Sequence, residues 1–148
     1  MKQRELVKLL MKFCCRPKVD SRKYLHRPWS AGAYTYASNG HILIRVKRIK
    51  SVRENKDAPT RRCNRILRDT ACIRYVKIPA RLTVYSHGIR GNRGFPDGVF
   101  IGAALLSKPY LALIRSLPGG QLTSMPFVIK PSGFKFDHGV GAIMPMRQ

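Results

Sequence analysis

The chain has 148 residues, the size of one ordinary domain, and 44% of them are hydrophobic, which excludes global disorder. Its 29 Lys and Arg against 7 Asp and Glu give a net charge of +22, far beyond what solubility requires. No apolar run approaches the roughly 18 residues of a membrane span, and the opening MKQRELVKLL interleaves basic with apolar residues, unlike a secretory signal.

An amphipathic helix is predicted at the N-terminus. Apolar residues between positions 6 and 13 recur at i, i+3, i+4 and i+7, and basic residues recur at i, i+4 and i+8 on the opposite side. The helix should end near Cys15, because Pro17 biases the residue before it away from helix. Residues 16–31 contain two prolines and are interpreted as loop. The basic residues of the helix are Arg4, Lys8 and Lys12.

Residues 34–46, YTYASNGHILIRV, have the Tyr, Thr and Ile content of a strand with a polar interruption in the middle. The interruption contains Asn39-Gly40, the strongest short hairpin signal, since both central residues of a type I′ turn need positive φ. We therefore predict a β-hairpin with a type I′ turn at Asn39-Gly40.

Residues 47–77 hold eleven Lys and Arg and three acids with little sustained periodicity. We interpret them as an exposed, partly mobile basic loop, with a short helix around Arg61 to Asp69 and a short strand at 73–78. The glycine-rich SHGIRGNRGFPDG that follows, residues 86–98, is predicted to be loop.

The last third of the chain is more regular. GVFIG at 98–102 is typical of a buried strand, and Ser107 is a helix N-cap with Pro109 in the first turn, where proline is tolerated. PGG at 118–120 should end that helix. Its predicted apolar face is Leu106, Tyr110, Leu113 and Leu117, and its opposite side is Lys108, Ala112 and Arg115. Three short strands are expected afterwards, PFVIK, GFKFD and VGAIMPM.

Helix followed by short antiparallel strands thus occurs twice, which is compatible with a degenerate internal repeat of about half the chain. Coincidence is the alternative, because this pattern is common.

No catalytic, metal or cofactor site is predicted. The four cysteines, an adjacent pair and two residues eight positions apart in the gap, do not have zinc-ligand spacing, and the acids are scattered mostly over loops. RGNRG at 90–94 lacks the strand and helix context of a nucleotide-binding loop. We expect a protein that is not an enzyme and needs no cofactor. The cysteines are Cys14, Cys15, Cys63 and Cys72, and the histidines, also without metal spacing, are His26, His41, His87 and His138.

YASNGHILIRV, residues 36–46, and the final AIMPMRQ resemble two segments of the bacterial replicative sliding clamp, the processivity subunit of DNA polymerase III. The first is similar to that family's alanine-threonine-aspartate-glycine-histidine-arginine-leucine segment, and the second to its methionine-proline-methionine-arginine-leucine carboxyl end. VFIGAALLSKPYLALIRSL and RELVKLLMKF resemble helix-containing parts of a clamp domain. Together these stretches cover somewhat less than half of the chain. Asn39 and Ile42 depart from the family's Asp and Arg.

The resemblance implies an α+β, DNA-clamp-like single domain spanning 1–148, with 47–77 as a basic insertion. Such a domain has two degenerate β-α-β-β-β halves, whose helices face a central DNA channel and whose sheets lie outside. The family also has a hydrophobic pocket that takes short peptides from polymerases and other replication proteins. The matching positions are Gly40, His41 and Leu43 in the turn, and Met144, Pro145, Met146 and Arg147 in the tail.

In the family the turn and the tail come from neighbouring domains, and a clamp subunit has three domains where this chain has one. The resemblance therefore implies a homo-oligomeric ring, closed by head-to-tail contacts between copies.

Double-stranded DNA is the expected polyanionic partner, because neutralising phosphates needs cations but no particular sequence. Anionic membrane is the weaker alternative, since Trp29 stands alone, and a basic surface without a dedicated site is also open. The predicted DNA-binding residues are Arg4, Lys8, Lys12, Lys108 and Arg115, with Arg61, Arg62, Arg65 and Arg68 as the second choice.

Two other functions remain open, a basic nucleic-acid packaging or RNA-binding protein and a decoy that sequesters a host replication partner. We expect a nucleoid-associated cytoplasmic location, in a bacterium or encoded by its virus.

Overall fold

The computed structural model describes residues 1–79, 84–85 and 97–147, and all statements below concern these residues. They contain helices and largely antiparallel strands, which confirms the expected mixed α and β class. The chain divides into two compact units, residues 1–69 with 138–142, and residues 70–137 with 143–148. Each unit is described by itself. The segments 80–83 and 86–96 lie outside the described residues, and with them the predicted RGNRG turn and His87.

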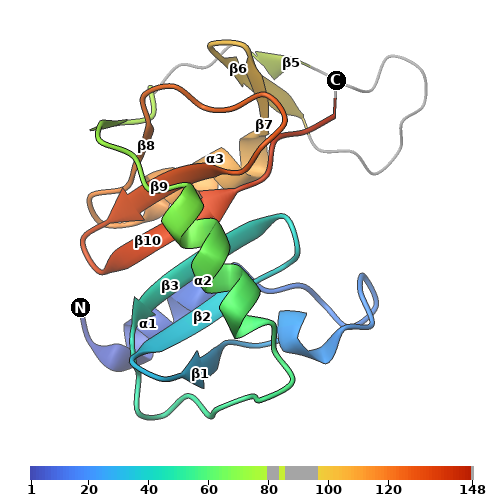
Figure 1. The fold of residues 1–148 in the computed structure, drawn as a ribbon, viewed down its shortest axis with the longest axis vertical. Helices are drawn as coiled ribbons and strands as arrows, with labels where there is room; N and C mark the ends of the chain where they lie inside the picture. The colour runs from blue at the N-terminus through green and yellow to red at the C-terminus, as the bar shows by residue number, and fades with distance from the viewer. Residues whose placement is uncertain (80–83, 86–96, 148) are drawn as a thin grey trace. The chain divides into compact units, whose positions relative to one another are not determined.

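The first unit is built around a sheet with the strand order β1-β2-β3-β10 (Figure 1). The strands β1 and β2 pair antiparallel, as do β2 and β3, and their register places Tyr36 opposite both Trp29 and Arg45. Its elements are α1 (Gln3–Met11), the short 3-10 helix η1 (Lys23–Leu25), β1 (Trp29–Ala31), β2 (Tyr34–Ser38), β3 (Ile42–Lys47), α2 (Thr60–Asp69) and β10 (Gly139–Ile143).

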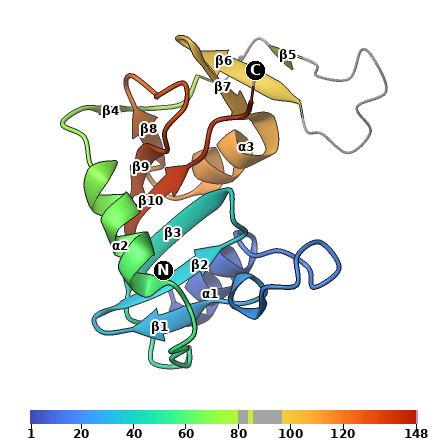
Figure 2. The same cartoon turned by 45° about the vertical axis from the view of Figure 1, so that its right-hand side comes forward.

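Helices cover both faces of this sheet. Because side chains alternate along a strand, Tyr36 lies on one face and its neighbours Thr35 and Ala37 on the other. Tyr36 packs in one cluster with residues of α2, whereas α1 contacts β2 and lies behind the sheet in both views (Figures 1 and 2). The first unit therefore has three layers, α1, the sheet and α2.

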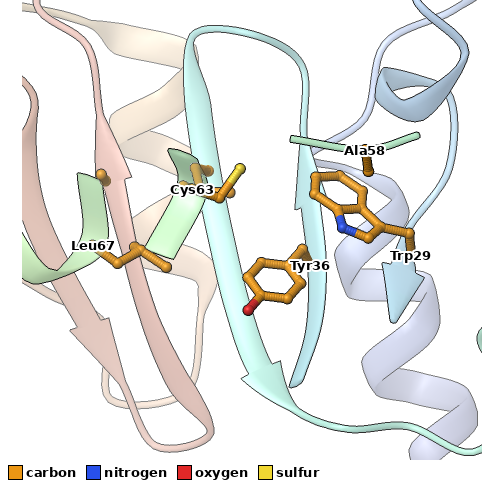
Figure 3. Packing of buried hydrophobic residues seen from close by; sticks show 7 residues of the cluster. Trp29, Tyr36, Ala58, Cys63 and Leu67 are labelled. Carbon is orange, nitrogen blue, oxygen red and sulfur yellow. The ribbon is translucent and has the colours of Figure 1, made fainter. Parts of the chain in front are cut away.

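The layer between α2 and the sheet is a hydrophobic cluster (Figure 3). The Trp29 and Tyr36 rings stack with their centroids 5.5 Å apart and their planes 10° from parallel. Cys63 and Leu67 of α2 close the cluster from above, with exposed fractions of 7% and 5%. The complete cluster is Trp29, Tyr36, Leu43, Ala58, Cys63, Leu67 and Ala142.

The second unit contains one helix, α3 (Lys108–Ser116), and two sets of strands within its described residues. The orders are β9-β8-β4 and β5-β6-β7, and their printed pairings are antiparallel. The Ser107 side chain accepts a hydrogen bond from the Tyr110 amide, which confirms the predicted N-cap. The strands are β4 (Tyr75–Val76), β5 (Val84–Tyr85), β6 (Gly98–Ile101), β7 (Ala104–Ser107), β8 (Gln121–Thr123) and β9 (Ser132–Phe136).

The predicted hairpin at 34–46 is confirmed, but its type I′ turn is wrong. Gly40 has φ of +93°, whereas no residue other than glycine has positive φ in the described chain, so Asn39 does not. The Asn39 side-chain oxygen accepts hydrogen bonds from the amides of His41 and Ile42, at 2.9 and 3.1 Å. This side-chain contact closes the turn in place of a second residue with positive φ.

Other expectations need correction. Residues 16–31 are not all loop, since they contain η1 and β1, and Trp29 is 1% exposed. PFVIK forms no strand and is largely exposed. The buried face of α3 consists of Leu111 and Ile114, because the helix is turned relative to the predicted face.

The expected basic loop at 47–77 is also more ordered than predicted. It contains α2, which confirms the short helix, and one side of α2 is buried against the sheet. Ile49, earlier in the same segment, is 1% exposed.

Candidate nucleic-acid interface

The basic residues of α1 lie on its exposed side. Leu10 is fully buried, and Lys8 and Lys12 are two residues before and after it, which places them about 160° around the helix. Arg4, Lys8 and Lys12 are all exposed. The amphipathic prediction for this helix is therefore confirmed, and its cations point away from the sheet.

The helix α2 carries a denser set of cations. Its inward residues are Cys63 and Leu67, and its outward residues are the arginine face, Arg61, Arg62, Arg65 and Arg68, all exposed. Arg68 lies 3.8 Å from the Asp69 carboxylate, and both side chains are mostly exposed. Among the described residues, no carboxylate comes within ion-pair distance of Arg61, Arg62 or Arg65. Three guanidinium groups therefore face solvent without a neutralising acid.

Polar contacts fix α2 on the sheet. The Trp29 indole nitrogen donates a hydrogen bond of 3.0 Å to the Thr60 hydroxyl. The Asn64 side-chain oxygen accepts from the Tyr36 hydroxyl at 2.6 Å and from the Arg45 guanidinium at 3.1 Å. Arg45 also lies over the Tyr34 ring, 4.1 Å from its centroid. These contacts, together with Cys63 and Leu67, determine which side of α2 faces outward.

In the second unit, Lys108 and Arg115 are exposed on α3 as predicted. Lys108 occupies the first helical position after the Ser107 cap, and Arg115 lies in the last turn. Leu111 and Ile114 hold the other side of the helix in the core.

Few acids offset these cations. Asp20 is held by the Arg22 guanidinium at 2.8 Å, and the hydrogen bonds from Arg22 lower the pKa of Asp20 to about 2. Glu54 pairs with Arg48 at 3.2 Å. Both pairs lie outside the arginine face of α2, so they leave it uncompensated.

The predicted peptide pocket is not assembled within either unit. Gly40 and His41 are exposed in the first unit, but Leu43 is only 6% exposed and belongs to the cluster with Trp29 and Tyr36. Leu43 is thus a core residue of the sheet, and it contributes to a surface pocket only if the core opens.

The tail residues belong to the second unit. The Met146 amide donates a hydrogen bond of 2.8 Å to the Leu105 carbonyl, which holds the tail beside β7. Met144 and Arg147 are exposed, and Pro145 and Met146 are half-buried. The peptide pocket remains a prediction.

Two cysteines are packed as apolar residues. Burial raises the pKa of Cys14 to about 12 and that of Cys63 to about 11, so both thiols are protonated near neutral pH. In the described part of the chain, no three His, Cys, Asp or Glu side chains gather closely enough to hold a metal ion. Nor does any helix there have the length and apolar character to cross a bilayer.

An exposed apolar segment was missed because PFVIK was read as a strand. Met125 and Ile129 are 80% and 82% exposed, between β8 and β9. The segment is held by the Phe127 amide, which donates to the buried Ser132 hydroxyl at 2.8 Å. The polar anchors of α2, Thr60 and Asn64, were also missed, because their partners come from strands distant in sequence.

Comparison with known proteins gives no relatives: no family model, curated protein or solved structure matches this chain.

Proposed function

We propose that the chain binds duplex DNA without sequence preference, as a sliding-clamp-like replication accessory factor. The observation that carries this proposal is that α1 and α3, each followed by three strands along the chain, both bury one side and expose cations on the other. Lysine and arginine held on helices attract phosphates whatever the base sequence, and moving by one base pair exchanges equivalent contacts.

The clamp resemblance of the turn and the tail supplies the rest of the proposal. Copies joined head to tail form a ring, and Gly40, His41 and the tail from Met144 to Arg147 dock short peptides of replication proteins. Such an assembly also accounts for the net charge of +22, because a polyanion inside the ring relieves the repulsion between copies.

A topological experiment tests the ring. The protein is bound to a closed circular plasmid and to the same plasmid cut once, and both are passed over a sizing column in raised salt. A ring stays on the circle and leaves the cut DNA through its ends. Equal retention on both forms refutes the ring and favours nucleic-acid packaging. A monomeric mass in light scattering with DNA present also contradicts it.

A charge-reversed variant tests the DNA-facing helix. Lys8→Glu with Lys12→Glu removes two exposed cations of α1, so the salt dependence of DNA binding should fall by about 0.9 per lost phosphate contact. The matched control is Lys18→Glu with Lys56→Glu, which reverses two exposed lysines of the same unit outside its helices. An equal effect in both variants means that net charge, and not α1, determines binding.

A further inference from the structure

The first unit presents cations on two opposite sides. Lys8 and Lys12 project from α1 on one side of the sheet, and the arginine face of α2 projects on the other (Figures 1 and 2). Between them lie the sheet and its two apolar layers. A straight duplex lying against α1 therefore leaves the arginines of α2 without contact.

We propose that the arginine face of α2 is a second nucleic-acid-binding surface, which holds another strand while α1 contacts the first duplex. The inference rests on the proposed function only for the role of α1. It requires neither a ring nor the peptide pocket.

The spacing of the arginines suits a phosphate backbone. Arg61, Arg65 and Arg68 follow each other at i, i+4 and i+7, so they lie along one side of the helix over about 10 Å. One strand of a duplex has a phosphate about every 3.4 Å of axis, so this row spans about three of them. Arg62 flanks the row, and guanidinium groups form paired hydrogen bonds to phosphate oxygens.

The surface is built in a fixed orientation. Trp29 and Tyr36 hydrogen-bond to Thr60 and Asn64 on the inner side of α2, and Cys63 is buried there. Turning the arginines inward would break both bonds and expose the cluster. The helix thus presents its cations before any ligand binds, which lowers the ordering cost of binding.

A nucleic acid fits this face better than a lipid surface. Helices that lie on membranes place large apolar residues beside their cations. The exposed residues of α2 are Arg61, Arg62, Arg65, Arg68 and Asp69, and all of them are charged. The apolar residues of α2 are instead turned to the sheet, where they are buried or half-buried.

A two-step capture experiment tests the second surface. The protein is loaded on an immobilised duplex and washed, and a labelled second oligonucleotide, single-stranded or duplex, is then added. The variant Arg61→Glu with Arg65→Glu should keep the first duplex as well as the Lys18→Glu, Lys56→Glu control does. At about 0.1 M salt each phosphate contact contributes about eightfold, so the loss of two should weaken second-strand capture by about 60-fold.

The substitutions leave the fold intact, because both arginines are exposed and position 61 lies in the first helical turn, where a carboxylate is favourable. An unchanged melting temperature checks this, and Arg61→Gln with Arg65→Gln repeats the test without reversed charge.

Second-strand capture by the α2 variant at the level of the control overturns the inference. Loss of all DNA binding in the α2 variant, with full binding in the Lys8→Glu, Lys12→Glu variant, supports the arginine face as a nucleic-acid surface. That result at the same time refutes the role proposed for α1.

Discussion

The contact between the Tyr36 hydroxyl and the Asn64 side chain allows a sharp test of how α2 is held on the sheet. Tyr36 is 1% exposed and its hydroxyl donates to Asn64 at 2.6 Å, while Asn64 accepts a second bond from Arg45. Tyr36→Phe removes one neutral hydrogen bond but leaves the ring stacked on Trp29 and Asn64 still paired with Arg45. We expect a loss of about 1 kcal/mol in the free energy of unfolding.

Asn64→Ala has a different consequence, because it leaves the buried Tyr36 hydroxyl without its partner. An unpaired buried hydroxyl costs about 1 to 3 kcal/mol, and the better helix propensity of alanine returns about 0.5. In this background Tyr36→Phe removes the unpaired hydroxyl, so the double variant should be as stable as Asn64→Ala alone, or more stable. The lost Arg45 bond is common to both and cancels.

Urea unfolding followed by tryptophan fluorescence measures these differences in the first unit. Trp29 is the single tryptophan and is stacked on Tyr36, so its emission reports the opening of this cluster. If the double variant loses the sum of the two single losses, the hydroxyl and the amide are not coupled. The placement of α2 on the sheet would then be refuted.

Three further predictions concern single sites. Gly40→Ala should lower the melting temperature more than Gly102→Ala, because φ of +93° disfavours a side chain and its Cβ would lie 3.2 Å from the Arg22 guanidinium, whereas Gly102 has open space. NMR titration should give Asp20 a pKa of about 2, and Arg22→Gln should return it toward 3.8. Because this pKa is lowered on folding, the pair stabilises the fold above about pH 4, and its contribution is lost as the pH falls toward 2. Cys14 and Cys63 should resist iodoacetamide near about pH 8 until the protein is unfolded, as mass spectrometry would show, since their pKa values are raised by burial; fast labelling of folded Cys63 would contradict its position under α2.

The helices with strong local signals could be predicted from sequence. The apolar period of α1 and the cap of α3 are encoded by neighbouring residues, and both helices begin within a few residues of the predicted positions. The hairpin was found for the same reason. Its turn type was missed because the side chain of Asn39 replaces one backbone conformation with a hydrogen bond.

The position of α2 could not be predicted, because its inner side is narrow. Cys63 and Leu67 are too few to produce a clear apolar period beside four arginines. The residues that hold it, Trp29 and Tyr36, come from strands whose register decides which face they occupy. β1 was missed since a three-residue strand next to prolines has no pattern of its own.

The cations of this chain therefore have to be grouped by layer and not by position in the sequence. Lys8 and Arg65 are both exposed, and a sum of charges treats them as equivalent. Yet the sheet with Trp29 and Tyr36 on one face and Ala37 on the other separates them, so they do not reach the same phosphate. Since α2 lies on the sheet face turned away from α1, a clamp built from this unit would have cations outside the channel as well as inside. An outer set of unpaired arginines costs stability through repulsion unless a second polyanion meets it, and this is why the arginine face of α2 needs its own ligand.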